Sequence, residues 1–444
     1  MKESKFNLFY KDENVANFVL FNSKSTALVI MTPEEIKIYK NLLKKSFYAE
    51  TSDEITLVNE LKKGDFLVDD NTDELEILRF LQKCSQFSTN SLGLTIAPTL
   101  SCNFGCNYCY EGKHNINSKM SDEVQEQIIN LVKNHIHTIS SLDVTWYGGE
   151  PLLAMDVIEN LSSNFLSICT ENKISYNASI ITNGYCLTKD IAKKFNDLHI
   201  SFAQITLDGN KFYHDSKRPL KNGSGTFDRI ISNLVDIKAI FSNIVIRVNT
   251  DNLNKEHVSD IIHILKEKDL LNITAPYLGY IEPTNDFYSI QNCLSQDQFA
   301  EVNNNFFSEL SKNITIDSLT NYPTPKLNSC IADSINGYVI DPNGKLFRCW
   351  CDIGFDEYSI GSLKEGITNY KRVTEYFNYD VFSDDTCKNC NIAPLCLGGC
   401  PRRRIDNKDD HCSPIKYSLK ENIFSVVHGK NPDINSLYPF DIYY

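Results

Sequence analysis

Strand-like and helix-like segments alternate between residues 94 and 281, and this rhythm restricts the possible folds more than any other feature of the chain. The strand-like segments are rich in β-branched residues, which is typical of a parallel sheet covered by helices. Six such units are too few for a closed eight-stranded barrel, so the sequence predicts an α/β fold with an open, partial (βα)6 barrel. Strands are expected at residues 94–97, 142–147, 174–182, 200–207, 244–249 and 273–281, and helices at residues 121–136, 154–169, 189–198, 226–240 and 255–266.

The regions on either side of the barrel have a different character. Residues 1–91 contain two strand-like segments, at 18–21 and 27–30, followed by three helix-like segments, the second of which ends at Gly64. This outline resembles a winged-helix-like module of the kind that recognises peptides. The barrel is assigned to residues 92–283, a polar and partly helical bridge to 284–329, and a turn-rich C-terminal domain stapled by metal to 330–444.

Cysteine usage is the main chemical clue, because the chain of 444 residues contains 15 cysteines. No apolar run is long enough to span a bilayer, and the first residues lead into no apolar segment of a secretory signal. We therefore expect a cytoplasmic protein without a membrane partner, in which thiols bind metal or do redox chemistry. The formal charge of −13 argues against a nucleic-acid partner, whose binding surface would be basic.

A compact group of three cysteines follows the first predicted barrel strand, where an active-site loop belongs in a parallel sheet. Cys102, Cys106 and Cys109 are separated by three and then two residues. Three thiolates can hold three irons of a cubane iron–sulfur cluster and leave the fourth iron open. The alternatives are a zinc site completed by His114, or a tight loop of thiols without a metal.

The pattern C-x3-C-x2-C, with Tyr108 before the last cysteine, resembles the signature of the radical S-adenosylmethionine (SAM) enzymes, whose barrel is TIM-like. The resemblance implies that these cysteines hold a [4Fe-4S] cluster whose open iron chelates SAM, and that Tyr108 packs near the adenine. Gly148, Gly149 and Glu150 end the second predicted strand and match the family's GGE motif, which contacts the SAM amino group. Glycine lets the backbone approach a ligand closely, although a plain strand-to-helix turn would also use it.

Further residues resemble family segments near SAM or substrate. Asn183 follows the third predicted strand, Thr206 ends the fourth, and Arg247 lies on the fifth. A structural turn or a partnered barrel arginine explains each of them about as well. Residues 214–218, His-Asp-Ser-Lys-Arg, resemble a loop that is frequent in peptide-modifying members of the family.

A second set of cysteines occupies the C-terminal region. A four-cysteine zinc knuckle would explain part of its spacing. The complete pattern resembles the SPASM extension of many radical SAM enzymes, which carries two auxiliary [4Fe-4S] clusters. The family wiring implies one cluster on Cys387, Cys390, Cys396 and Cys412, and another on Cys330, Cys349 and Cys400.

The second auxiliary cluster has only three assigned ligands. Cys351 or Cys293 fills the fourth place, or one iron stays open. An open iron resembles enzymes that make thioether crosslinks in cysteine-rich peptides. Anaerobic sulfatase maturases place an aspartate directly after the cysteine that corresponds to Cys349, whereas this chain has Trp350 there. Asp352 is the candidate catalytic base that could replace it.

The resemblance therefore implies a radical SAM oxidoreductase that modifies a ribosomal precursor peptide. A 5′-deoxyadenosyl radical would remove a hydrogen atom from the peptide, and a thioether bond would close. An electron donor such as flavodoxin or ferredoxin would serve as partner, and the N-terminal module would hold the leader segment. Alternatives are sulfatase maturation by formylglycine formation, carbon–carbon crosslinking, epimerisation, or a non-catalytic metal-binding scaffold.

Overall fold

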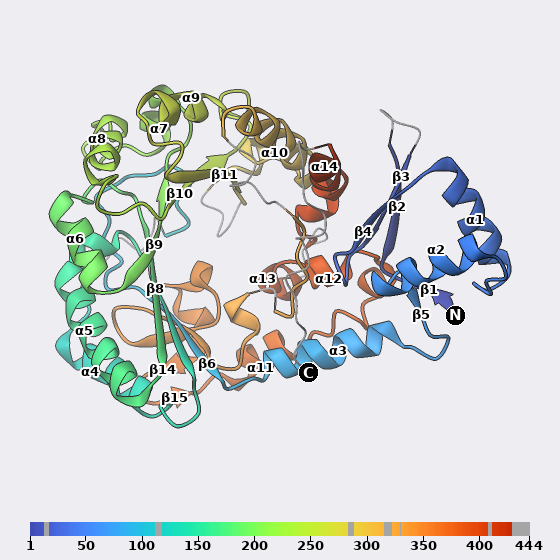
Figure 1. The fold of residues 1–444 in the computed structure, drawn as a ribbon. Coiled ribbons are helices and arrows are strands. Elements are labelled where there is room, and N and C mark those ends of the chain that lie inside the picture. Colours follow the sequence, from blue (N-terminus) through green and yellow to red (C-terminus); the bar gives the residue numbers. More distant parts are fainter. Residues whose placement is uncertain are drawn as a thin grey trace.

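The computed structural model describes residues 1–12, 17–111, 118–282, 288–314, 322–328, 330–406 and 411–428. Its centre is a curved sheet in which six parallel strands follow one another in sequence order (Figure 1). The α/β partial barrel that the sequence predicts is thereby confirmed. The six strands are β6 (Ser91–Ile96), β7 (Ser141–Trp146), β8 (Ser175–Thr182), β9 (Ile200–Thr206), β10 (Ile244–Thr250) and β11 (Thr274–Tyr280).

Helices cover the outer face of this sheet, as Figure 1 shows at its left side. Their apolar sides and the β-branched strands share one large core, in which Ile180, Ile205 and Ile246 have no exposed surface. The sequence predicts a loop at residues 214–218, whereas the structure forms a short helix there because Asn210 caps its first turn. The helices are α4 (Asp122–Lys133), α5 (Met155–Asn172), α6 (Lys189–Asp197), α7 (Lys211–Lys217), α8 (Phe227–Ile237) and α9 (Asp260–Glu267).

The sheet does not stop at the first barrel strand. Strand β12 (Gly337–Ile340) pairs in parallel with β6, and three further antiparallel strands extend the sheet to ten strands. The C-terminal region therefore begins on the edge of the barrel itself. The added strands are β13 (Lys345–Phe347), β14 (Gly361–Ser362) and β15 (Gly366–Ile367).

The N-terminal region forms a smaller sheet with its own core. Strands β2 (Asn7–Lys11), β3 (Phe18–Asn22) and β4 (Leu28–Met31) are antiparallel, and β1 (Lys2–Glu3) pairs with β5 (Leu67–Val68). The sequence predicts β3 and β4 but misses β2. Helices α1 (Pro33–Lys44) and α2 (Ser52–Lys63) begin with capping boxes, and α3 (Glu74–Gln86) follows them.

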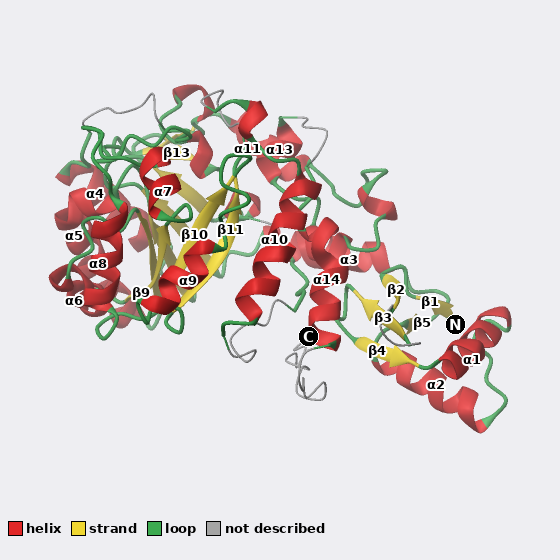
Figure 2. Cartoon of the chain, turned by 90° about the horizontal axis from the view of Figure 1, so that it is seen from above, coloured by secondary structure: helices red, strands yellow, loops and turns green. Residues whose placement is uncertain are grey.

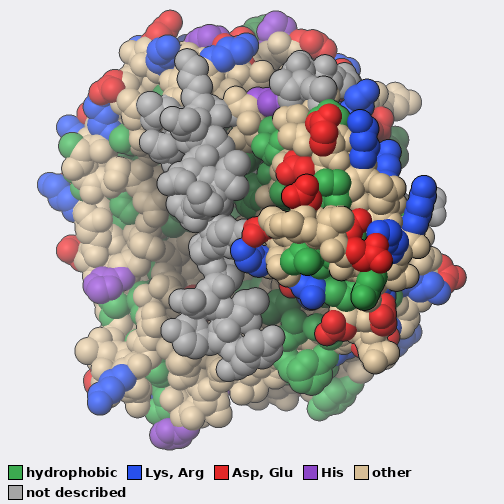
Figure 3. All heavy atoms as spheres, turned by 45° about the vertical axis from the view of Figure 1, so that its right-hand side comes forward, with side chains coloured by type: hydrophobic (Ala, Val, Ile, Leu, Met, Phe, Trp, Pro, Cys, Tyr) green, Lys and Arg blue, Asp and Glu red, His purple; other side chains and the backbone are tan. Residues whose placement is uncertain are grey.

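The N-terminal sheet packs on the C-terminal region. One apolar cluster joins Val19 and Phe21 to Leu395 and Ile423, and a second joins Phe6 to Phe382. Figure 2 shows α14 between the barrel and this sheet, and Figure 3 shows acidic and basic side chains interspersed on one face. The helices after the barrel are η3 (Ile290–Asn292), α10 (Gln296–Ser311), η5 (Ile331–Asp333), η6 (Trp350–Asp352), η7 (Asp356–Tyr358), α11 (Tyr370–Asn378), η8 (Cys387–Asn389), α12 (Ala393–Cys396), α13 (Pro401–Ile405) and α14 (Ile415–Val427).

Among the described residues, no helix is both long and apolar enough to cross a lipid bilayer.

Candidate active site

The loop of residues 102–109, called the cysteine loop below, starts a few residues after β6 ends at the mouth of the barrel. The structure brings its three thiols together, because Cys102 and Cys106 both contribute to the raised pKa of Cys109, after burial and Glu111. Burial is also the largest cause that raises the pKa of Cys102 to about 12. The thiols are therefore neutral in the metal-free protein at neutral pH, and metal binding must release their protons.

A second segment holds the cysteine loop from one side. Residues 217–221, called the strap below, run antiparallel to the loop, with an isolated bridge between Phe104 and Leu220. The backbone N–H of Gly105 donates to the Pro219 carbonyl at 2.8 Å. These backbone bonds fix the shape of the loop without using any of its thiols, which stay available as ligands.

The surroundings of Cys102 suit a thiolate. The backbone N–H of Phe104 donates to its Sγ atom at 3.4 Å, and the Asn183 amide nitrogen lies 3.9 Å from it. Hydrogen bonds to sulfur stabilise the charged form of a thiol and tune any iron–sulfur group bound to it. His114, the fourth ligand in the zinc alternative, lies outside the described residues.

Gly148 and Gly149 pack against the backbone that leads into the cysteine loop. A Cβ atom on Gly149 would lie 2.5 Å from the carbonyl oxygens of Leu100 and Ser101, and one on Gly148 would lie 2.4 Å from that of Thr99. Gly148 also has a φ of 110°, which disfavours other residues. In this structure the glycines are required by close contact between the turn after β7 and the segment that leads into the cysteine loop.

Glu150 is fully buried below these glycines. Its carboxylate accepts hydrogen bonds from the Thr182 hydroxyl and the Asn183 backbone N–H, both at 2.7 Å, and from the Leu152 N–H at 3.1 Å. Burial raises the pKa of Glu150, while these three donors counteract the rise. The carboxylate caps η1 (Pro151–Ala154) and ties β7 to the end of β8.

The Tyr108 hydroxyl is the centre of a buried polar network. It donates to Asp208 Oδ2 at 2.5 Å and accepts from Arg218 Nη1 at 2.6 Å and from Asn249 Nδ2 at 2.9 Å. Burial raises the pKa of both Tyr108 and Asp208, whereas the Arg218 charge lowers both. The network connects the cysteine loop with the ends of β9 and β10 and with the strap.

Thr206 and Arg247 lie opposite each other on β9 and β10. Arg247 Nε donates to Asn249 Oδ1 at 2.7 Å, and its guanidinium lies 5.8 Å from the centre of the Tyr277 ring. Gly279 leaves room for this side chain, because a Cβ atom there would lie 2.5 Å from Arg247 Nε. Arg247 is therefore partnered within the barrel wall.

A second group of thiols lies in the C-terminal region. A small cavity is lined by Gly398 and Lys416 together with the thiols of Cys387, Cys390, Cys396 and Cys412. The Lys416 ammonium lies 3.5 Å from Cys412 Sγ. The structure therefore brings together all four cysteines that the family resemblance groups in one set.

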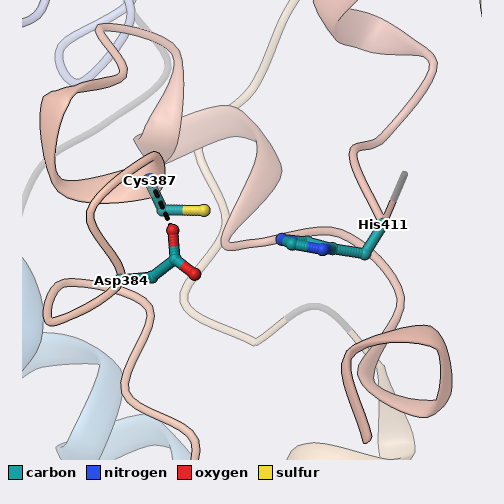
Figure 4. A group of neighbouring side chains, drawn as sticks. All are labelled: Asp384, Cys387 and His411. Atoms are coloured by element: carbon teal, nitrogen blue, oxygen red, sulfur yellow. Dashed lines mark hydrogen bonds between the residues drawn. The ribbon is translucent and has the colours of Figure 1, made fainter. Parts of the chain in front are cut away.

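Two residues that the sequence did not single out flank this set. Asp384 and His411 offer ligand atoms within 4.8 Å of each other and of Cys387 Sγ, and Figure 4 shows the three side chains converging. The Asp384 carboxylate also accepts from the Cys387 backbone N–H at 2.9 Å. Their spacing in the sequence gives no signal for this contact.

The third group contains Cys330, Cys349 and Cys400. Cys349 and Cys400 both contribute to the pKa of Cys330, which burial raises to about 12. Cys351 forms a hydrogen bond with Cys349 that is the largest cause of that thiol's raised pKa. Cys293 donates to the Ser289 carbonyl instead. Of the two candidates for a fourth ligand, the structure brings Cys351 to this group.

Tyr147 connects the third group with the barrel. Its ring stacks on Trp350 with ring centres 5.5 Å apart, and Trp350 lies between Cys349 and Cys351. Burial raises the pKa of Tyr147, and the thiols of Cys351, Cys109 and Cys349 raise it further. Tyr147 therefore lies between the first and third thiol groups. Its position next to Gly148 in the sequence did not predict this location in the fold.

Asp352 has no exposed surface and is held by two arginines. Its carboxylate lies 2.7 Å from Arg402 Nε and 3.3 Å from Arg372 Nη2, and Tyr376 donates to it at 3.3 Å. Burial raises the pKa of Asp352, and both arginines lower it. This carboxylate anchors α11 and α13 to η6.

Comparison with known proteins places these residues in a family. Residues 96–266 match the model of the Radical SAM superfamily. The cysteine-type anaerobic sulfatase-maturating enzyme of Clostridium novyi (strain NT) is 26% identical over 375 residues, which cover 76% of this chain and 97% of that protein. The serine-type enzyme of Bacteroides thetaiotaomicron is 24% identical over 72% of this chain and 84% of its own.

Two solved structures share the fold. Native anSMEcpe with bound AdoMet aligns with a TM-score of 0.59 and 21% identity, covering 76% of this chain and 97% of that one. Streptococcus suis SuiB bound to precursor peptide SuiA aligns with a TM-score of 0.54 and 15% identity, covering 93% and 97%. The cofactors of the matched superfamily are a [4Fe-4S] cluster and SAM. Residues 96–266 are therefore a radical SAM domain, and the similarity to named maturating enzymes identifies the protein as an enzyme.

Proposed function

We propose that this enzyme matures a ribosomal precursor peptide by joining a cysteine sulfur to a carbon atom of the same peptide in a thioether. Similarity to named maturating enzymes supports the general activity, and so does the fold shared with SuiB, which was solved with a precursor peptide. The thioether is the finer part of the proposal, and it depends on the third thiol group and on Asp352.

Cys102, Cys106 and Cys109 would hold the first cluster, because the strap holds their loop through backbone hydrogen bonds that do not involve the thiols. When bound, the reduced cluster and SAM supply a 5′-deoxyadenosyl radical that takes a hydrogen atom from a substrate carbon. Gly148 and Gly149 keep the cysteine loop against β7, while Glu150 and Asn183 shape the loop's inner side. The barrel wall would exclude water from the reacting groups.

The remaining SAM contacts stay predictions from the family resemblance. Tyr108, Thr206 and Arg247 surround the barrel mouth, and each is polar or aromatic and partly or fully buried. The hydrogen bonds of Tyr108 to Asp208 and of Arg247 to Asn249 would orient these two side chains near a ligand placed above the ends of β9 and β10.

The two C-terminal thiol groups would hold the auxiliary clusters. The first set fits a closed cluster, because four thiols already line one cavity. The other set has three assigned thiols with Cys351 beside Cys349; the proposal leaves Cys351 off the cluster, and the open iron would be able to bind the thiolate of a substrate cysteine. The ligand sets are Cys387, Cys390, Cys396 and Cys412 in one case and Cys330, Cys349 and Cys400 in the other.

The single observation that favours thioether formation over formylglycine formation is the state of Asp352. A catalytic base must reach the substrate and accept its proton. Asp352 is fully buried and paired with Arg402 and Arg372, so both arginines would have to move before it accepted a proton. Similarity to the sulfatase-maturating enzymes supports formylglycine formation as the second candidate.

The N-terminal region would bind the leader segment of the peptide. Among the described residues, β4 pairs only with β3, so its outer edge presents unpaired backbone groups. An extended peptide can add a strand to such an edge. A flavodoxin or ferredoxin would supply electrons in the cytoplasm.

The first test asks whether the protein cleaves SAM. Anaerobically reconstituted protein should contain about twelve iron atoms per chain if all three clusters form. It should release 5′-deoxyadenosine only when a reductant is present. Cys102→Ala should abolish that release, whereas Cys169→Ala, which changes a buried thiol of the barrel core, should keep it. Zinc without SAM cleavage would support a metal-binding scaffold instead.

The second test separates the two candidate products. The enzyme is incubated with a cysteine-rich precursor peptide and with a cysteine-containing sulfatase peptide, and the products are read by mass spectrometry. A thioether removes two hydrogen atoms from the peptide and protects one cysteine from alkylation. Formation of an aldehyde on the sulfatase peptide, with no change in the precursor peptide, would contradict the thioether proposal.

The third test concerns the open auxiliary iron. Cys351→Ala should keep the iron content and SAM cleavage of the native protein, because the proposed open iron does not need this thiol. Loss of iron and of cluster absorbance in this variant would show that Cys351 is a ligand and would contradict an open iron.

A further inference from the structure

Arg218 is a buried cation next to the cysteine loop, close enough to Cys102 and Cys106 to affect the pKa of both thiols. Its side chain is 9% exposed. Its guanidinium carbon lies 5.7 Å from the centre of the Phe104 ring and 5.9 Å from that of Tyr108. Phe104 lies between Cys102 and Cys106 in the loop, and Tyr108 precedes Cys109. The guanidinium is therefore close to both arms of the loop.

The hydrogen bonds of this guanidinium are incomplete. Nη1 donates to the Tyr108 hydroxyl, whereas the buried Nε–H has no hydrogen-bond partner among the described residues. An unsatisfied buried donor costs about 1–3 kcal/mol, and more when the group is charged. Such a donor in a native structure calls for an explanation, and a bound group that accepts its hydrogen bond is one.

The backbone fixes the position of Arg218. It belongs to the strap, which is bonded to the cysteine loop on both sides of it. Lys217, the preceding residue, forms a buried ion pair with Asp251 at 2.7 Å, so the strap is also anchored to the end of β10. Arg218 therefore cannot move away from the thiols without disrupting this pairing.

Electrostatics agree with the geometry. Burial works against the charge of Arg218, yet the neighbouring Cys106, Tyr108 and Asp208 keep its pKa well above the ordinary value. The same charge lowers the pKa of Cys106 against the effect of burial. A positive charge in a poorly solvated place stabilises added negative charge strongly.

We infer that Arg218 is a positioning residue which directs its Nε–H toward the iron–sulfur group held by the cysteine loop and makes that group easier to reduce. The inference rests on the proposed binding of a cluster by Cys102, Cys106 and Cys109. Reduction adds one negative charge to the cluster, and both the cation and a hydrogen bond to sulfur favour the reduced state. Arg218 would thus set how readily SAM cleavage begins.

A redox titration followed by electron paramagnetic resonance tests this role. The signal to follow is that of the reduced cluster which changes when SAM is added. It is compared between the native protein and Arg218→Met, a variant that keeps the length of the side chain but removes its charge. We expect the variant to bind the full amount of iron. Its equilibrium constant for reduction of the cluster should fall at least tenfold, which corresponds to a reduction potential lower by about 59 mV for one electron.

Two further variants control this experiment. Lys221→Met removes a positive charge from an exposed position of the same strap and should leave the potential unchanged, because water and salt screen that charge. Arg218→Lys keeps the charge but not the Nε–H donor, so its potential should lie between those of native protein and Arg218→Met. If Arg218→Met fails to bind iron, a lowered potential in Arg218→Lys supports the inference, and a native potential overturns it.

The outcomes separate the two proposals. An unchanged potential in fully loaded Arg218→Met contradicts the role of Arg218 and leaves the proposed cluster intact. A native protein without any SAM-responsive signal contradicts the proposed function, and the role of Arg218 with it.

Discussion

At the scale of single residues, the Tyr108 hydroxyl holds together groups from three parts of the chain. Tyr108→Phe removes one acceptor and one donor from a buried network, and leaves Asp208, Arg218 and Asn249 each short of a partner. We expect a loss of about 1–3 kcal/mol in the free energy of unfolding, measured by urea denaturation. Tyr176→Phe, which loses only a long bond to Ser162, should cost less and serves as control.

Gly149 tests the contact between β7 and the cysteine loop. Gly149→Ala places a Cβ atom 2.5 Å from two carbonyl oxygens, so the loop has to shift and its three thiols lose their spacing. We expect a clear fall in iron bound by the anaerobically reconstituted protein. Gly105→Ala is the matched control inside the loop, because its Cβ atom would meet nothing closer than 3.8 Å. Equal iron binding by both variants would contradict the contact.

At the scale of secondary structure, two neighbouring arginines of α13 form ion pairs with other segments, and one of them is much more buried than the other. Arg404 is 3% exposed and lies 3.0 Å from Asp333, whereas Arg403 pairs with Glu282 at 3.4 Å in a more exposed place. Arg404→Met takes the cation from a buried carboxylate and should cost about 3–5 kcal/mol of unfolding free energy. Arg403→Met should cost less than about 1 kcal/mol. Similar losses in denaturant melts would argue against this difference.

At the scale of the whole molecule, the barrel and the C-terminal region depend on metal to different degrees. The barrel has a large apolar core of its own, while the C-terminal thiols gather around a small cavity between short helices. Removing iron should therefore expose the region around Cys387 and Cys412 to hydrogen exchange and proteolysis before the barrel strands. Uniform loss of protection over β6 to β11 would contradict this order.

The sequence predicted the barrel well because each strand carries its own local signal. The predicted β-branched segments end within a few residues of the observed strands. Strand β2 was missed because Asn7–Lys11 has weak alternation and gains its stability from pairing with β3. Pairing between strands leaves no signal in the local sequence of either strand.

The same limit applies to the candidate site. The three thiols of the cysteine loop lie close in sequence and share one loop, whereas Cys412 joins Cys387, Cys390 and Cys396 only through the fold, and the family resemblance rather than a local pattern grouped these four. Asn249, Asp384, His411 and the stack of Tyr147 on Trp350 meet their partners only through the fold. The sequence singled out Arg218 as part of residues 214–218. Its contact with Tyr108 in the cysteine loop joins positions more than a hundred residues apart in the sequence, so no local pattern predicts it.

The parallel pairing of β12 with β6 has a practical consequence for anyone who wishes to shorten the protein. A fragment that ends before Gly337 would leave the backbone groups of β6 open to solvent along one side, directly below the cysteine loop. Bare strand borders of this kind recruit neighbouring chains and lead to insoluble material. A truncation that removes β12 is therefore expected to aggregate rather than to give a minimal catalyst.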